Sequence, residues 1–185
     1  NTTWAPTTNA AVRDIKVSPD GSRVYIAGLF SQVNGQARYR VAALDANTGA
    51  LISDWRPEVN GRVNGLAVRG NVVYIAGLFT AVSGTPRARI AAVDATTGAL
   101  LPFAPEATGG YGAQSIEISP DGQKAIIAGD FTAVNGSTNP GRGMAAVDTT
   151  SGALLPWLAN SLIRNADERA GLTSLTSDGD PVYAT

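Results

Sequence analysis

Short apolar runs recur along this chain at a spacing of about fifty residues, and they organise the rest of the sequence. The run Val24–Leu29 returns as Val73–Leu78 and, with substitutions, at residues 125–130. The isoleucines at positions 26, 75 and 127 are 49 and 52 residues apart (75 − 26 and 127 − 75). Residues 182–185 resemble the opening of the same run, beginning with the same Val-Tyr pair. A period of this length predicts a repeat architecture.

Each repeat unit is predicted to hold four short antiparallel strands. In the first unit the apolar positions place them at Val12–Val17, Arg23–Leu29, Arg38–Leu44 and Leu51–Trp55, with the alternating or continuous apolarity typical of strands. Turn signals separate them: residues 18–21 are Ser-Pro-Asp-Gly and residues 45–49 are Asp-Ala-Asn-Thr-Gly, with glycine at a left-handed position. The later units carry related signals, and no long stretch has a helical period.

We therefore expect an all-β fold made of β-propeller blades, each of four antiparallel strands. Residues 11–58, 59–106 and 107–158 would each form a blade, residues 1–10 the last strand of a preceding blade, and residues 159–185 the start of a further one, all in one propeller domain. A β-solenoid of stacked hairpins is the alternative, but it favours shorter and more regular repeats. Three complete blades with partial flanking blades form an incomplete ring. We expect the chain to be a segment of a longer protein, whose remainder, or another chain, completes the propeller.

The repeat has the pattern V-x-x-I-x-V-S-P-D-G-x-x-V-Y-I-A-G-x-F-x-x-V-N-G, then R-x-A-A-L-D-A-x-T-G-A-L, then W-x-P. Over nearly the whole chain this resembles the delta-sixty-type β-propeller repeats of secreted bacterial proteins, many of them from actinobacteria. The resemblance implies a secreted or cell-surface protein with a non-catalytic binding or scaffold role, and a glycan or protein as its partner. Residues 43–49 with Trp55 also resemble the tryptophan-docking repeat of pyrroloquinoline-quinone dehydrogenases, although the vicinal cysteines of that family are missing.

Composition excludes several kinds of chemistry. The 185 residues include no cysteine and no histidine, so disulfides, thiolate or histidine metal sites and a Ser-His-Asp triad are absent from this sequence. A net charge of −1 gives no electrostatic footprint for nucleic acid. No apolar run reaches the length that spans a membrane, so we expect no membrane insertion.

Recurring polar and aromatic residues are expected to serve the repeat itself. Aromatic rings at positions 4, 55, 103 and 157 are predicted to pack between units, with a sugar-stacking platform as the alternative. The recurring arginines are predicted to bind turn aspartates rather than an anion. They are Arg38 with Arg40, Arg87 with Arg89, and Arg142 in the third unit. The Asp-x-x-Thr-Gly loops lack the dense oxygen ligands of a calcium loop. We therefore predict no cofactor and no metal, with calcium at these loops as the alternative.

Candidate binding residues lie where the units differ, because variable loops on a rigid scaffold are where binding usually occurs. The links between units lengthen along the chain, and an aspartate replaces leucine at the end of the third apolar run. A solvated loop with internal ion pairs is the plainer interpretation of the charged link. A propeller-type enzyme is the alternative function, either a quinone-dependent oxidoreductase or a hydrolase or lyase that acts on polysaccharide. Its catalytic residues would lie largely outside this segment. The predicted ligand-binding residues are Tyr111, Asp130, Arg164, Asp167, Glu168 and Arg169.

Overall fold

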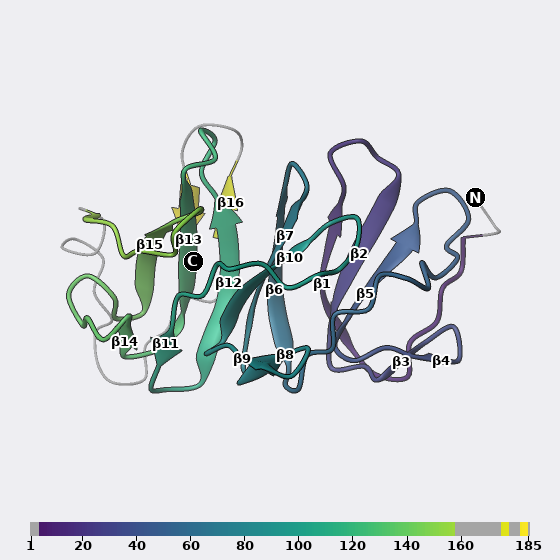
Figure 1. Cartoon of the computed structure of the whole chain (residues 1–185), viewed down its shortest axis with the longest axis horizontal. Helices are drawn as coiled ribbons and strands as arrows, with labels where there is room; N and C mark the ends of the chain where they lie inside the picture. The colour runs from purple at the N-terminus through teal and green to yellow at the C-terminus, as the bar shows by residue number, and fades with distance from the viewer. Residues whose placement is uncertain (1–3, 158–174, 178–181, 185) are drawn as a thin grey trace.

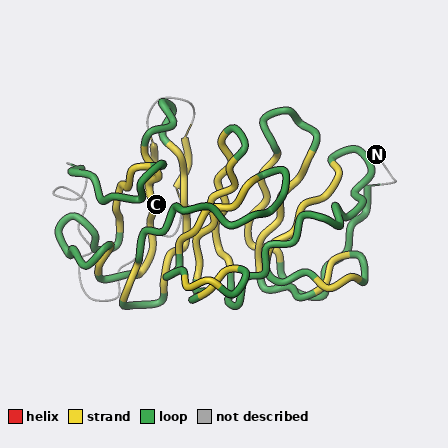
Figure 2. Tube along the Cα trace, viewed as in Figure 1, coloured by secondary structure: helices red, strands yellow, loops and turns green. Residues whose placement is uncertain are grey.

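The computed structural model of the chain describes residues 4–157, 175–177 and 182–184. Within these ranges the protein is all-β, and none of the residues is helical (Figure 2). This confirms the predicted fold class at the level of secondary structure. No helix in the described part of the chain is long and apolar enough to cross a membrane.

Three three-stranded antiparallel sheets form the body of the molecule (Figure 1). In each sheet the strand that comes second in the chain lies in the middle. The first sheet contains β1 (Val12–Val17), β2 (Arg23–Gly28) and β5 (Val41–Asp45); the second contains β6 (Val63–Arg69), β7 (Val72–Gly77) and β10 (Ile90–Asp94); the third contains β12 (Gly112–Ile118), β13 (Lys124–Asp130) and β15 (Met144–Asp148).

Four two-stranded sheets accompany these three. Three of them run along one edge of the molecule (Figure 1), and we call this edge the hairpin edge. They are β3 (Gln32–Val33) with β4 (Gln36–Ala37), β8 (Ala81–Val82) with β9 (Thr85–Pro86), and β11 (Ala107–Thr108) with β14 (Ala133–Val134). The fourth pairs β16 (Leu175–Ser177) with β17 (Val182–Ala184). None of the described sheets closes on itself.

The first strands of successive sheets lie next to one another. β1 contacts β6, β6 contacts β12, and β12 contacts β16. An ion pair also joins the first sheet to the third, because Lys16 Nζ of β1 lies 3.5 Å from Glu117 Oε2 of β12. The sheets are therefore stacked in sequence order, with their first strands along a common line.

A β-bulge at the start of each first strand fixes its register. The pairing shifts between Val12 and Asp14, between Val63 and Gly65, and between Ala113 and Ser115. Opposite the bulge stands a buried glycine, Gly77 in the second sheet, whose missing side chain lets the strands approach. A Cβ on Gly77 would lie 2.1 Å from the Arg62 carbonyl oxygen. The repeated glycine of the apolar run is thus required by close backbone contact.

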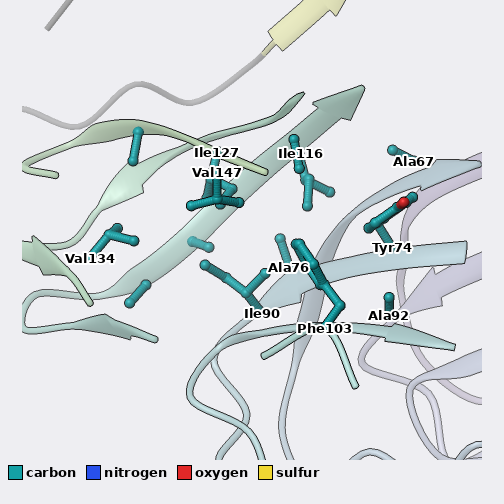
Figure 3. Close-up of a cluster of buried hydrophobic side chains, with 14 of the residues drawn as sticks. Ala67, Tyr74, Ala76, Ile90, Ala92, Phe103, Ile116, Ile127, Val134 and Val147 are labelled. Carbon is teal, nitrogen blue, oxygen red and sulfur yellow. The ribbon is translucent and has the colours of Figure 1, made fainter. Parts of the chain in front are cut away.

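Apolar side chains from adjacent sheets form shared cores. Figure 3 shows the core between the second and third sheets, where Tyr74, Ala76 and Ile90 face Ile116 and Ile127. In this core the Tyr74 and Phe103 rings meet edge to face, with centroids 5.2 Å apart. Each sheet therefore buries its apolar face against its neighbour, which confirms that the continuous apolar runs are packing elements.

The recurring aromatics bind the turn of the next unit. Trp55 is fully buried, and its Nε1 donates to the Asp94 carbonyl oxygen at 3.0 Å. Trp4 Nε1 donates to the Asp45 carbonyl oxygen at 3.3 Å in the same way. The ring of Trp55 also packs against Tyr25, at 5.2 Å between centroids. The prediction that these rings pack between units is confirmed for the described residues.

The expected fourth strand of each unit is present only as a single antiparallel bridge among the described residues. Leu51 forms a single bridge with Leu44, and Leu100 and Leu154 do the same with Val93 and Val147. The chain then turns away so that Trp55 can reach the next unit. The third strand also begins later than expected, at Val41, because Arg40 adopts a left-handed conformation with φ of 70°. Four-stranded blades and a propeller ring thus remain predictions.

Candidate functional site

One group of residues departs from the pattern of the other units and gathers at one place on the surface. We call it the Tyr111 patch, and it consists of Arg89, Gly109, Gly110, Tyr111 and Asp130. Asp130 ends β13 and pairs with Gly112, the first residue of β12. Tyr111 precedes Gly112 in the chain, so the structure brings these two predicted site residues close together. The patch lies at the end of the connection between the second sheet and the third.

The link that carries Tyr111 is tied to the hairpin of the third unit. The Glu106 amide donates to Asn135 Oδ1 at 2.8 Å, and the Asn135 amide donates back to the Glu106 carbonyl at 2.8 Å. The Thr132 amide donates to the Thr108 carbonyl at 2.8 Å. These bonds fix both strands of the β11–β14 pair. The link therefore leaves the hairpin edge at a defined point before it reaches Tyr111.

Asp130 stands where the other two units have leucine. The residue is half-buried. The link passes close to it, because a Cβ on Gly110 would come within 2.0 Å of the Asp130 carbonyl oxygen and 2.7 Å of Oδ1. Gly110 also has a φ of 54°, which glycine adopts at no steric cost. The glycine pair at 109–110 thus allows the chain to pass directly over the aspartate.

Arg89 holds the same link from the second sheet. Its guanidinium donates to the Gly109 carbonyl and, at 3.4 Å, to the Gly110 carbonyl. Burial lowers the pKa of Arg89, and the negative charge of Asp130 opposes that shift. The Arg89 cation and the Asp130 carboxylate therefore lie near enough to interact electrostatically.

The exposed ring of Tyr111 gives the patch its binding potential. The residue is 73% exposed, the largest value among the exposed large hydrophobic side chains of the described chain. An aromatic face beside hydrogen-bonding groups suits a ligand with both apolar and hydroxyl surfaces, because the ring offers contact area and the phenol offers a polar group. The arrangement suits binding at a surface rather than enclosure of a small molecule.

Four of the predicted site residues have no described position. Arg164, Asp167, Glu168 and Arg169 lie outside the described residues. Arg89 and the glycine pair are functional candidates that sequence reasoning missed, since Arg89 stood out only as a member of a recurring pair. The one available signal was the Gly-Gly-Tyr-Gly sequence at 109–112.

The predicted partner of the paired arginines is wrong. Arg38 donates to the carbonyls of Ala37 at 2.6 Å and Ser53 at 2.8 Å, and Arg87 donates to Pro86 and Leu101 in the same way. These guanidinium groups bind backbone carbonyls rather than turn aspartates. Burial lowers the pKa of Arg38, and the nearby charge of Arg56 adds to this shift.

The turn aspartates are used within their own turns. Asp45 Oδ1 accepts from the Asn47 amide at 3.0 Å and from the Thr48 amide and hydroxyl, both at 2.8 Å. These bonds lower the pKa of the Asp45 carboxyl, and those from Thr97 and Ser151 act in the same direction on Asp94 and Asp148. Each carboxylate therefore stabilises a loop. No group of three or more carboxylates positioned to hold a metal ion occurs among the described residues.

A pocket of about 200 Å³ opens between the first and second sheets, lined in part by Asp20, Arg23, Tyr25 and Asn71. Sequence reasoning missed it. Its lining comes from the turn after β1, the turn after β6 and the start of the turn after β10. Its main polar side chains bind the protein itself: the Tyr25 hydroxyl donates to the Ala95 carbonyl at 2.7 Å, and Arg23 donates to the Ala95 and Thr96 carbonyls. We therefore take the Tyr111 patch as the candidate site.

Comparisons with known proteins do not identify a functional site in this chain. A scan against models of protein families finds no match for the chain, and a search of curated proteins finds none.

Proposed function

We propose that this chain is part of a secreted or cell-surface β-propeller that binds a glycan through the Tyr111 patch and has no catalytic role of its own. The propeller arrangement accounts for the stacking of the three sheets with their first strands side by side. A protein surface is the second kind of partner that this role allows.

The observation that carries the proposal is the exposed ring of Tyr111 on a link held from both sides. Sugar rings present CH groups on one face and hydroxyl groups at their edges. An exposed aromatic ring packs against the former, and carboxylate or phenol oxygens bind the latter. Because Arg89 and the β11–β14 pair already hold the link, little conformational entropy is lost when a ligand binds.

The roles of the recurring carboxylates also favour binding over catalysis. Asp20, Asp45, Asp94, Asp121 and Asp148 all accept hydrogen bonds from their own turns. The feature that departs from this pattern is Asp130, which pairs with Gly112, the residue after Tyr111. No second carboxylate suited to acid–base work is shown beside it among the described residues.

A glycan array probed with the chain tests the proposal. We expect binding to a restricted set of glycans, strongly reduced by Tyr111→Ala. Tyr39→Ala is the matched control, since Tyr39 is also an exposed tyrosine but lies in the first unit. A flat array, or equal binding by the two variants, would contradict a glycan-binding role for the patch.

A further inference from the structure

An arginine side chain bridges the turns of the second and third units. Arg69 ends β6, and its Nη2 donates to the Pro120 carbonyl oxygen of the third unit at 2.8 Å. The guanidinium lies against the third unit's turn, because a Cβ on Gly122 would come 3.2 Å from both Nε and Nη2 of Arg69. A guanidinium group is therefore accommodated where the turns of these two units meet.

The junction between the first and second units has a serine at the same place. The strand registers make Ser18 equivalent to Arg69. The Ser18 hydroxyl donates to Asp20 Oδ1 of its own turn at 2.5 Å. On the facing turn, a Cβ on Gly70 would meet no atom within 4 Å. The pocket of about 200 Å³ is thus found at the junction where serine replaces the bridging arginine.

The polar side chains that line this pocket direct their protons into the protein. The donors are the Ser18 and Ser22 hydroxyls to Asp20, the Tyr25 hydroxyl to the Ala95 carbonyl, the Thr96 hydroxyl to Asn71 Oδ1, and Asn71 Nδ2 to Asp94 Oδ2. A hydroxyl that donates to the protein keeps lone pairs that can accept. The pocket therefore suits a ligand that brings N–H or O–H donors.

The charges around the pocket favour a cation among such ligands. Hydrogen bonds, first among them that of the Ser18 hydroxyl, lower the pKa of Asp20 to about 2, so its carboxyl is ionised at neutral pH. Asp94 adds a second negative charge behind Asn71, at 2.6 Å from its Nδ2. Arg23 is the cation of the lining, and its Nη1 is bound to two backbone carbonyls of the second unit at 3.0 and 3.1 Å. Two carboxylates thus face one guanidinium.

We propose that this pocket binds a guanidinium group supplied by a ligand. The planar guanidinium offers two parallel N–H donors to a carboxylate such as Asp20 and further donors to hydroxyl and carbonyl oxygens. The position of Arg69 provides the template within the chain itself.

This site is separate from the Tyr111 patch. The turns after β1 and β6 lie on the edge of the molecule opposite the hairpin edge (Figure 1), whereas the link to Tyr111 leaves from the hairpin edge. The inference therefore does not depend on glycan binding, and each site can fail its own test without affecting the other.

Titration of the wild-type chain with N-acetyl-L-argininamide, followed by amide chemical shifts in NMR spectra, is the first test. We expect saturable shifts at the amides of Ser22, Gly70 and Asn71. N-acetyl-L-lysinamide carries the same charge without the planar fork, and it is expected to bind at least about tenfold more weakly. Shifts that do not saturate at these amides, or equal affinity for the two compounds, would overturn the proposal.

A variant that supplies the guanidinium from within the chain tests the template. Ser18→Arg places an arginine at the position equivalent to Arg69, and it is expected to abolish binding of N-acetyl-L-argininamide. Ser119→Arg is the matched control, because Ser119 makes the same 2.5 Å bond to Asp121 in the third unit as Ser18 makes to Asp20. It should bind as the wild type does, and undiminished binding by Ser18→Arg would contradict the assignment.

The carboxylate has its own pair of variants. Asp20→Asn is expected to weaken binding of N-acetyl-L-argininamide at least about tenfold, as loss of a hydrogen bond to a charged group does. Asp121→Asn makes the same change in the third unit's turn and should leave the affinity unchanged. Equal affinities of these two variants would show that Asp20 does not bind the guanidinium.

Discussion

At the residue scale, a few left-handed backbone positions shape the hairpin edge. Asn34, Ser83 and Asn135 have φ values of 48–49°, and each is followed by glycine. This is the two-residue turn that favours Asn-Gly. Arg40 and Arg89 have φ values of 70° and 72°, where the third unit has Gly143. An arginine is retained at these two positions although glycine would avoid the steric cost.

The link to Tyr111 is expected to depend on Arg89. Arg89→Gly keeps the backbone conformation, as Gly143 does, but removes the donors to Gly109 and Gly110. We expect faster amide hydrogen exchange over residues 109–112, measured by mass spectrometry, with the rest of the sheet still protected. Arg40→Gly is the matched control, because Arg40 donates to Leu29 within its own unit. Unchanged exchange in Arg89→Gly would show that the guanidinium does not hold the link.

Stability is expected to fall in acid because of the turn aspartates. Hydrogen bonds from the Ser18 hydroxyl and from Ser22 lower the pKa of Asp20 to about 2, and the pKa values of Asp45, Asp94, Asp121 and Asp148 are also lowered. A carboxyl with a lowered folded pKa stabilises the fold above its unfolded pKa of about 4 and loses that contribution as the pH falls through the folded value. Glu117 acts in the opposite direction, since burial raises its pKa.

The measurement for this prediction is the thermal unfolding midpoint from pH 7 down to pH 2. It should stay nearly level above pH 5 and drop below pH 4. The variant Asp45→Asn/Asp94→Asn/Asp148→Asn should start lower and drop less steeply, whereas Asp54→Asn, outside these turns, should follow the wild type. Parallel curves for the triple variant and the wild type would refute this origin of the acid sensitivity.

The turns could be predicted from sequence, but the arginine partners could not. Glycine, asparagine and aspartate report the backbone conformation of a turn directly, and Gly49 and Gly98 indeed have positive φ values of 73° and 74°. A guanidinium, in contrast, binds a carbonyl as readily as a carboxylate. The spacing of Arg38 and Arg87 therefore did not reveal that their partners are Ser53 and Leu101.

At the scale of the secondary-structure elements, the β-bulges set how each first strand meets its neighbour. Gly77→Ala is expected to destabilise the protein, because the new Cβ would lie 2.1 Å from the Arg62 carbonyl and 2.9 Å from the Val63 Cα. Overpacking of this kind costs about 1–3 kcal/mol. Urea denaturation measures the change.

Gly84→Asn is the control for this substitution. Gly84 has a φ of 77°, and no atom lies within 4 Å of the place that a Cβ would take. Asparagine tolerates that backbone conformation. We expect a change well below that of Gly77→Ala. Equal losses would mean that the close approach at the bulge does not matter.

Element boundaries were the least predictable part of the fold. The apolar runs located β2, β7 and β13, but apolarity alone could not show that Leu51 forms only a bridge before the chain leaves for the next unit. The pocket beside Asn71 was missed for a related reason. It is lined by residues of two different units, the Ser18–Tyr25 segment of the first and Gly70, Asn71, Ala95 and Thr96 of the second. The repeat pattern within each unit does not show which residues of different units come together.

At the scale of the whole molecule, the aromatic residues that reach into the next unit hold the stack together. Trp55→Ala should cost about 3–5 kcal/mol of unfolding free energy, as truncation of a buried ring does, because Trp55 packs on Tyr25 and binds the Asp94 carbonyl. Trp55→Phe keeps most of the packing and loses the hydrogen bond, which is worth about 1 kcal/mol. Chemical denaturation of both variants separates the two contributions, and a mild loss in Trp55→Ala would contradict this role.

Binding is expected where the third unit departs from the other two. Its most direct test is calorimetric titration of a glycan selected on the array into the wild type, Tyr111→Ala, Asp130→Leu and Tyr39→Ala. Asp130→Leu restores the residue found at the same position of the first two units. We expect Tyr111→Ala and Asp130→Leu each to weaken binding at least about tenfold, a loss of about 1.4 kcal/mol, and Tyr39→Ala to bind as the wild type does. Unchanged affinity in both patch variants would contradict it.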